Sequence, residues 1–281
     1  MANYKKRYGR SWMMSNVSYS PEHSDFLRKQ RKEKLIVRIW QFAILVGIIV
    51  LWEVLGYFGV INTFIMSSPS RIINTIAELI ASGDLLYHTA ITLYETILGF
   101  AIATILGTII AILLWWSERL RKILDPYIVV LNSLPKIALG PIIIIWVGAG
   151  IQSIVTICVL ILIIVTIISM LNAFRECDQD KIMLMKSMGA NTWQILWKLI
   201  LPSSIPQFIS VLKINVGLSW VGTIMGEYLV SSAGLGYLIV YGSQVFQLDL
   251  VMASTLILCV LASIMYLVVA LLEKRILKSR H

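Results

Sequence analysis

Long apolar runs, separated by shorter polar segments, divide most of this chain. Six of the runs hold about 20 residues or more, which is the length that a helix needs to cross a hydrocarbon layer about 30 Å thick. In chain order the predicted spans are Ile39–Phe58, Ile91–Trp116, Tyr127–Val147, Ile151–Leu171, Gln207–Val230 and Leu250–Leu272. The pattern therefore predicts an all-α, polytopic membrane protein with six transmembrane helices.

The composition agrees with this fold class, since 58% of the residues are hydrophobic and only 14% are charged. We divide the 281 residues into a basic N-terminal segment (1–38), a transmembrane domain (39–272) and a short C-terminal tail (273–281). The first apolar run begins late and lacks the small-residue cleavage pattern of a signal peptide. We therefore interpret it as a retained span.

Lysine and arginine residues gather on one side of the predicted membrane. With the N-terminus inside the cell, only Arg71 lies in an outer segment, while Lys136 and Lys213 lie within spans. Basic residues in short loops stay cytoplasmic, so we expect a multi-pass protein of the cell membrane with both termini in the cytoplasm. Contact with an anionic lipid bilayer explains the net charge of +9. We expect no nucleic-acid partner.

One outer segment, SSPSRIINTIAELIASGD, predicts a short amphipathic helix. Ser68 is placed to cap it, and Pro69 stands at the first helical position, where its missing N–H costs nothing. The apolar face of this helix either packs on the bundle of spans or binds an external partner.

One cytoplasmic loop, residues 172–206, is longer than a connection between two spans requires. Its stretch DKIMLMKSM predicts a helix that ends at Gly189, because glycine takes the left-handed conformation of a helix terminus without steric cost. Asn191 and Gln194 have the spacing of a capping box for a second helix, which we expect to end before Pro202. That second helix places these apolar residues on one face: Trp193, Leu196, Trp197 and Ile200. The loop is either held by another protein or is an amphipathic connector that rests on the bilayer.

Motifs in and around this loop resemble a known transporter family. The GA at 189–190 and the ILP at 200–202, with a helix between them, are similar to the cytoplasmic coupling loop, or EAA loop, of permease subunits of ATP-binding-cassette importers. The blocks DPYIVVLNSLPKIALGPIIIIWVGAG (125–150) and GEYLVSSAGLGYLIVYGSQVF (226–246) are similar to blocks of the nitrate, sulfonate and taurine branch of that family. Two positions depart from the family pattern. Residues 183–185 are Met-Leu-Met instead of Glu-Ala-Ala, and Glu95 stands where many members have arginine.

This resemblance implies a type I importer permease fold and a role as the membrane subunit of an ATP-driven importer. It implies two ATPase subunits, a second copy of the permease in a homodimer, and an extracytoplasmic solute-binding protein that delivers a small polar or anionic solute. ATP and magnesium would be bound by the ATPases, so we expect no cofactor in this chain. A short helix docked in a cleft of the ATPase is a stiff element through which motion can pass. The residues assigned to ATPase coupling are Lys181, Met183, Met185, Lys186, Ser187, Gly189, Ala190, Asn191 and Pro202.

No motif in the sequence indicates catalysis by this chain itself. It has no phosphate loop, no HExxH and no nucleophile elbow, and the GLG at 234–236 lacks the third glycine of a dinucleotide site. The cysteines, Cys158, Cys177 and Cys259, are too widely spaced for a metal site, so we interpret them as packing residues. We therefore expect a non-enzymatic subunit without a metal.

Polar residues within the spans indicate a translocation path. The fifth span carries a stripe of polar side chains at four-residue intervals: Asn215, Ser219, Thr223 and Glu227. The third span adds Asn132 and Lys136 beside Pro135 and Pro141, which interrupt the hydrogen bonding of a helix, as happens in transporter cavities. Polar groups in a membrane face protein or water, so the stripe either lines a path or holds helices together.

Small residues in two spans predict close helix packing. The second span has a ridge of Gly99, Ala103, Gly107 and Ala111, and the fifth span has Gly222 and Gly226. Such ridges let two helix backbones approach each other, and we interpret them as packing surfaces without a further role.

A second function class is a self-contained secondary transporter or channel. That class is expected to show inverted repeats or a relay of buried carboxylates, whereas no internal repeat is evident and Glu53, Glu95 and Glu227 lie near span ends. An adjacent gene for an ATPase would favour the importer. The sequence alone does not name the substrate.

Overall fold

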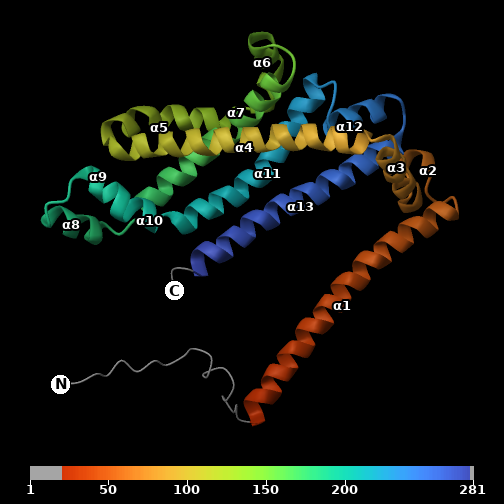
Figure 1. The fold of residues 1–281 in the computed structure, drawn as a ribbon, viewed down its shortest axis with the longest axis horizontal. Helices are drawn as coiled ribbons and strands as arrows, with labels where there is room; N and C mark the ends of the chain where they lie inside the picture. The colour runs from red at the N-terminus through yellow and green to blue at the C-terminus, as the bar shows by residue number, and fades with distance from the viewer. Residues whose placement is uncertain (1–20, 279–281) are drawn as a thin grey trace, which may run out of the picture. The chain divides into compact units, whose positions relative to one another are not determined.

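A computed structural model describes residues 21–278, and within that range it contains helices and turns but no strand. The predictions for residues 1–20 and 279–281, which form most of the basic segment and the end of the tail, lie outside the described residues. The chain divides into two units, residues 1–61 and 62–281, which we describe separately (Figure 1). The described range contains five helices long and apolar enough to cross a membrane and one bent pair of helices that together pass the same test.

The first unit is one long helix, α1 (Pro21–Tyr57), followed by a turn. Its apolar part, Lys32–Tyr57, includes nearly all of the first predicted span. The helix begins well before the predicted Ile39, inside the basic segment 1–38 that the sequence predicts as a separate region. Lysine, arginine, glutamate and glutamine are good helix formers, so the polar segment continues the helix that the apolar span begins.

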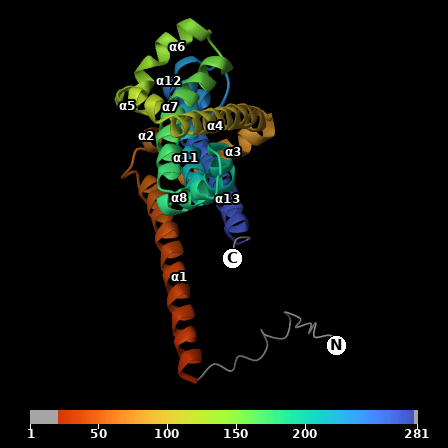
Figure 2. The same cartoon turned by 90° about the vertical axis from the view of Figure 1, so that its left-hand side faces the viewer.

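In the second unit, α4 (Asp84–Trp116), α7 (Ile151–Arg175) and α11 (Ile205–Val230) pack side by side (Figures 1 and 2). The predicted small-residue ridge lies at their contact. A Cβ atom added to Gly99 would lie 2.5 Å from Cys158 Sγ, and one added to Gly107 would lie 2.7 Å from Thr166 Cβ. The expectation of close packing is therefore confirmed, since no larger residue fits at these crossings.

The long helix α13 (Leu248–Lys278) packs on α11 and runs between the two ends of the unit. At one end, Arg71 forms an ion pair of 2.6 Å with Asp249 at the start of α13. Toward the other end, Lys213 forms an ion pair of 2.5 Å with Glu273. We call the first the α12 end, after α12 (Leu235–Gln244), and the second the α8 end, after α8 (Gln179–Ser187). The helices α4, α7 and α13 run toward the α8 end and α11 runs back, as the predicted six-span order requires.

The third predicted span is not one helix, and this prediction is wrong in part. The structure has α5 (Glu118–Ser133), a 3₁₀ turn η1 (Lys136–Leu139) and α6 (Gly140–Val147), and the two parts meet at an angle of 86°. Leu134, which precedes Pro135, is extended with φ −65° and ψ 137°. Proline disfavours helical backbone in the residue before it and donates no hydrogen bond, so the helix ends there.

The outer amphipathic segment forms α3 (Pro69–Ser82), preceded by the short α2 (Thr63–Met66). Ser68 Oγ accepts a hydrogen bond of 3.5 Å from the Arg71 N–H, and Pro69 stands in the first turn, as predicted. The helix packs on α13 and α4. Packing on the bundle is thus the interpretation that the contacts bear out, while binding of an external partner stays a prediction.

Candidate functional site

The loop at the α8 end has the local structure that its sequence predicts. Helix α8 ends just before Gly189, whose φ of +80° is the left-handed value that favours glycine, and the Ala190 N–H donates to the Met185 carbonyl at 3.0 Å. The next helix, α9 (Thr192–Ile195), begins with a capping box, in which Asn191 Oδ1 accepts from the Gln194 N–H at 2.8 Å and Gln194 Oε1 accepts from the Asn191 N–H at 3.0 Å. Two satisfied caps around one glycine make a stiff corner.

Helix α8 has two apolar faces, one packed against the protein and one exposed. Ile182 and Met185 pack against the core, while Met183 and Leu184 are 66% and 61% exposed and Met188, which follows the helix, is 78% exposed. Met183 and Met185 therefore do not act together, because residues two apart on a helix point in nearly opposite directions. Leu184 and Met188 were not among the predicted site residues, although their spacing of four residues is a signal for a shared face.

The polar residues assigned to coupling are also at the surface of this loop. Lys181 is paired with Asp178 at 3.6 Å, and the Ser187 hydroxyl donates to the Met183 carbonyl at 3.0 Å. Lys186 is exposed on the same helix. Pro202 is separate from this group, since it lies in the later turn α10 (Leu201–Ser203).

The second helix of the loop differs from its prediction in two ways. It does not stop before Pro202, because a π-helical turn, η2 (Leu196–Ile200), leads directly into α10. Its apolar residues also divide between two surroundings: Leu196 and Ile200 are buried, whereas Trp193 and Trp197 are 56% and 55% exposed. The wider π turn changes the angular spacing of side chains, so a pattern read at 3.6 residues per turn fails here.

The two exposed indoles belong to a row of aromatic side chains. The rings of Trp193 and Trp197 are 5.6 Å apart, and Trp116 at the end of α4 lies 6.0 Å from Trp193. Tryptophan rings prefer the boundary between membrane and water. The row therefore ties the loop to the end of a span, at the depth where an interfacial anchor is expected.

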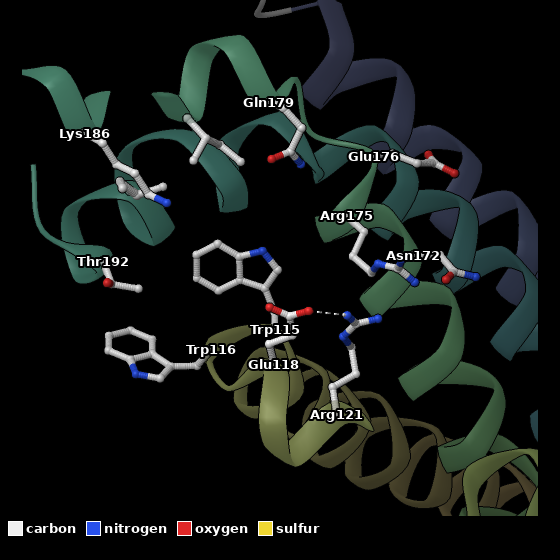
Figure 3. Close-up of a pocket in the computed structure, with 12 residues that line it drawn as sticks. Trp115, Trp116, Glu118, Arg121, Asn172, Arg175, Glu176, Gln179, Lys186 and Thr192 are labelled. Atoms are coloured by element: carbon white, nitrogen blue, oxygen red, sulfur yellow. Dashed lines mark ion pairs between the residues drawn. The ribbon is translucent and has the colours of Figure 1, made fainter. Parts of the chain in front are cut away.

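A polar cavity of about 840 Å³ separates α8 from the ends of α4, α5 and α7 (Figure 3). Arg121 pairs with Glu118 at 3.6 Å in its wall, and Figure 3 shows the Arg175 guanidinium beside this pair. Lys186 of α8 also lines it. The loop is thus not packed flat on the span ends, so α8 has room to shift and polar groups of a partner have room to enter.

The polar stripe of the fifth span lies inside the bundle. Its members are all at most 1% exposed: Asn215, Ser219, Thr223 and Glu227. Asn215 Nδ2 donates to Thr104 Oγ1 at 3.0 Å and to Thr166 Oγ1 at 2.9 Å, which joins α11 to α4 and α7. Asn132 and Lys136 lie elsewhere, on α5 and η1, where Lys136 Nζ donates to the Asn132 carbonyl at 2.9 Å; Asn132 is exposed and Lys136 is half-buried.

Glu227, at the α12 end of the stripe, meets a residue that the sequence analysis did not assign to the site. Its carboxyl lies within hydrogen-bonding range of the Glu95 carboxyl on α4. Both side chains are 1% exposed. In the sequence Glu95 was noted as a departure from the family pattern and, like Glu227, as a carboxyl near a span end. No local motif joins the two residues, and their common burial was not predicted.

Comparisons with known sequences agree on one family. The family model described as "Binding-protein-dependent transport system inner membrane component" matches residues 103–278. The aliphatic sulfonates transport permease protein SsuC of Bacillus subtilis is 32% identical over 234 residues, which cover 83% of this chain and 85% of that protein. The formylaminopyrimidine transport permease protein ThiX of Halalkalibacterium halodurans is 30% identical over 68% of this chain and 75% of its own length.

Solved structures share the fold. One is the inward-facing methionine ABC transporter MetNI, with a TM-score of 0.59, 20% identity, and coverage of 66% of this chain and 92% of that chain. Another is a bacterial ABC transporter involved in the import of the acidic polysaccharide alginate, with a TM-score of 0.61, 16% identity, and coverage of 88% and 99%. At this identity the likeness concerns the fold alone.

Proposed function

This chain belongs to the family of binding-protein-dependent transport system inner membrane components, and we propose that it forms, as a homodimer, the translocation path of an ATP-driven importer. An extracytoplasmic binding protein would deliver the solute at the α12 end. Two ATPase subunits, which would bind the ATP and magnesium, would dock at the α8 end. With this orientation the C-terminal end of α13 is cytoplasmic, and the N-terminus is proposed to be cytoplasmic from its basic residues.

The observation that carries the proposal is the exposed apolar surface of Met183, Leu184 and Met188 on a stiffly held helix. Exposed apolar side chains grouped on one element mark a surface that another molecule covers, and methionine adapts well to a groove. The stiff corner at Gly189 and the tryptophan row would transmit displacement of α8 to the spans, because a force passes only through elements that do not bend. This assignment does not need the usual Glu-Ala-Ala residues, since the contact would be apolar.

The solute is proposed to be a small polar or anionic organic molecule. Relatives named for aliphatic sulfonates, formylaminopyrimidine and taurine share 24–32% identity with this chain, and these names describe small polar compounds. Asn132 and Lys136 are proposed to line the path, because Asn132 is exposed and the half-buried Lys136 would attract an anion. The buried stripe of Asn215, Ser219, Thr223 and Glu227 would meet the solute only when α11 moves away from α4 and α7.

The docking surface is tested by Leu184→Glu, which places a charge in the proposed apolar contact. We expect the amount of ATPase that co-purifies with the permease to fall at least about tenfold, because a buried unpaired charge costs several kcal/mol. Solute-stimulated ATP hydrolysis in liposomes should fall with it. The matched control is Leu86→Glu, since Leu86 is 77% exposed at the start of α4, at the α12 end. This control should keep its ATPase.

Equal ATPase retention by the two variants would contradict the proposed docking surface. Solute uptake by the permease in liposomes without any ATPase would contradict the ATP-driven importer and favour the secondary transporter.

A further inference from the structure

The backbone N–H groups at the start of α12 donate hydrogen bonds to side chains of other helices. The Gly234 N–H donates to His88 Nδ1 at 2.9 Å, and the Leu235 N–H donates to Thr92 Oγ1 at 2.8 Å, both on α4. The Gly236 N–H donates to Glu227 Oε2 on α11 at 2.5 Å. The first N–H groups of a helix have no partner within it, so these three acceptors complete the turn. They also join α4, α11 and α12 at one point.

The Glu227 carboxyl occupies the space that side chains would take at 234 and 236. A Cβ atom on Gly234 would lie 2.5 Å from Glu227 Cδ, and one on Gly236 would lie 2.7 Å from Glu227 Oε2. Gly234 also has a φ of +114°. The GLG that did not fit a dinucleotide site is explained by this contact, because only glycine leaves room for the carboxyl.

Glu95 brings a second carboxyl to the same place. It lies within hydrogen-bonding range of Glu227, and no other residue donates a hydrogen bond to it in the described part of the chain. Neither carboxyl takes part in any of the ion pairs between described residues. Each also keeps one buried oxygen, Glu95 Oε2 and Glu227 Oε1, without a partner. Two ionised carboxylates in contact offer only acceptors and repel strongly in a dry interior.

We propose that Glu95 and Glu227 form a proton-binding site, in which the Glu95 carboxyl holds the proton and donates it to the Glu227 carboxylate. The assignment follows from the other contacts. Glu227 accepts backbone N–H bonds at the start of a helix, where a negative charge is favoured. Glu95 lacks such donors. The bound proton completes the attachment of α4 to α11 and α12, and its loss sets two negative charges against each other at this joint.

Among residues 21–278, no positively charged side chain acts on this pair in place of the proton. On α4, His88 accepts a hydrogen bond at Nδ1, so it is neutral with its proton on Nε2, and Asp84 lies near it. Of the titratable groups on the remaining elements, Cys158 on α7 lies near Glu95, Tyr228 on α11 lies near Glu227, and Tyr237 on α12 stacks on His88. None of these three side chains can carry a positive charge. Helix α6 (Gly140–Val147), which packs beside α7 and α11, carries no titratable side chain.

The sign of the pH effect follows from proton counting. Near neutral pH the folded protein holds a proton on this pair, whereas an exposed glutamate of the unfolded chain has released it. The folded state therefore binds more protons, and its stability falls as pH rises, by up to about tenfold in the unfolding equilibrium constant per pH unit.

The first test is infrared spectroscopy of the full permease in lipid, without ATPase, so that it is independent of the proposed transport function. We expect the carbonyl band of a protonated, buried carboxyl in the wild type at neutral pH, and its loss at strongly alkaline pH. The band should disappear in Glu95→Gln and remain in the control Glu78→Gln, whose glutamate is exposed on α3. Absence of the band from the wild type, or its persistence in Glu95→Gln, would overturn the proposal.

The second test compares thermal unfolding from neutral to alkaline pH. Glutamine has the same shape as glutamic acid and keeps a permanent N–H donor toward Glu227, so Glu95→Gln should be as stable as the wild type at neutral pH. At alkaline pH its unfolding midpoint should fall by no more than half as much as that of the wild type. Equal declines in the two proteins would refute the site. Should Glu95→Gln fail to fold, the wild-type infrared titration alone still decides the question.

Discussion

Single glycines on α11 determine how closely this helix approaches α7. A Cβ atom on Gly226 would lie 2.9 Å from Ile154 Cα, which is backbone and cannot rotate away. We therefore expect Gly226→Ala to push the helices apart and to lower the stability by about 1–3 kcal/mol, as overpacking does. The measurement is the thermal unfolding midpoint of the purified permease.

The matched control on the same helix is Gly217, which has nothing within 4 Å of an added Cβ. Gly217→Ala should be neutral or stabilise the helix by roughly 0.5–1 kcal/mol, because alanine loses less backbone entropy. If Gly226→Ala is as stable as this control, the close contact of α7 and α11 is not what limits residue size there.

The direction of α8 in the coupling loop depends on the backbone conformation of Gly189. Gly189 also has nothing within 4 Å of an added Cβ, so only its φ of +80° restricts substitution. Gly189→Val should cost roughly 1–2 kcal/mol in backbone strain and change the direction of α8. We expect loss of solute-stimulated ATP hydrolysis in liposomes while all spans still insert.

Asparagine tolerates the left-handed conformation better than other residues with a side chain, so Gly189→Asn is the control and should keep most of the coupling. Full coupling in the valine variant would mean that the loop is only a connector.

At the scale of the whole molecule, the proposed orientation places the α12 end outside the cell and the α8 end in the cytoplasm. Introduced cysteines test this orientation. A cysteine at Ser82, near the α12 end, should react with an impermeant thiol reagent on intact cells, and one at Lys181 should react only after permeabilisation. Exposed Cys259 is first replaced by serine, while Cys158 and Cys177 are buried. Reactivity in the opposite sense would reverse the proposed orientation.

The same thiol reagent tests whether Thr223 lines the translocation path. Thr223 is fully buried in the described bundle, so Thr223→Cys should react only during turnover with binding protein and ATP, when α11 would move. Lack of reaction under all conditions would assign the stripe to helix packing, the role that the hydrogen bonds of Asn215 already serve.

Local features of this protein were predictable from short stretches of sequence. The caps at Ser68 and Asn191 and the glycine corner at Gly189 each depend on residues within a few positions of one another, and each span depends on one continuous apolar run. Their signals are the length of an apolar run, the distance of a capping side chain from an N–H group, and the one residue that accepts positive φ. The bend at Pro135 was recognisable as an interruption, but its angle was not, because packing of α6 decides the direction in which the chain continues.

By itself the sequence determined an all-helical membrane chain, the order of its spans and the stiff corner of its long loop, since these depend on hydrophobic length and backbone conformation. Only the tertiary structure decided that Met183 and Leu184 are exposed while Met185 is covered, and that the carboxyls of Glu95 and Glu227 meet at the start of α12. Such contacts join residues far apart in the chain, and no spacing along the sequence records them. These contacts depend on how well the surfaces of two helices fit together, and that fit exists only in the packed bundle.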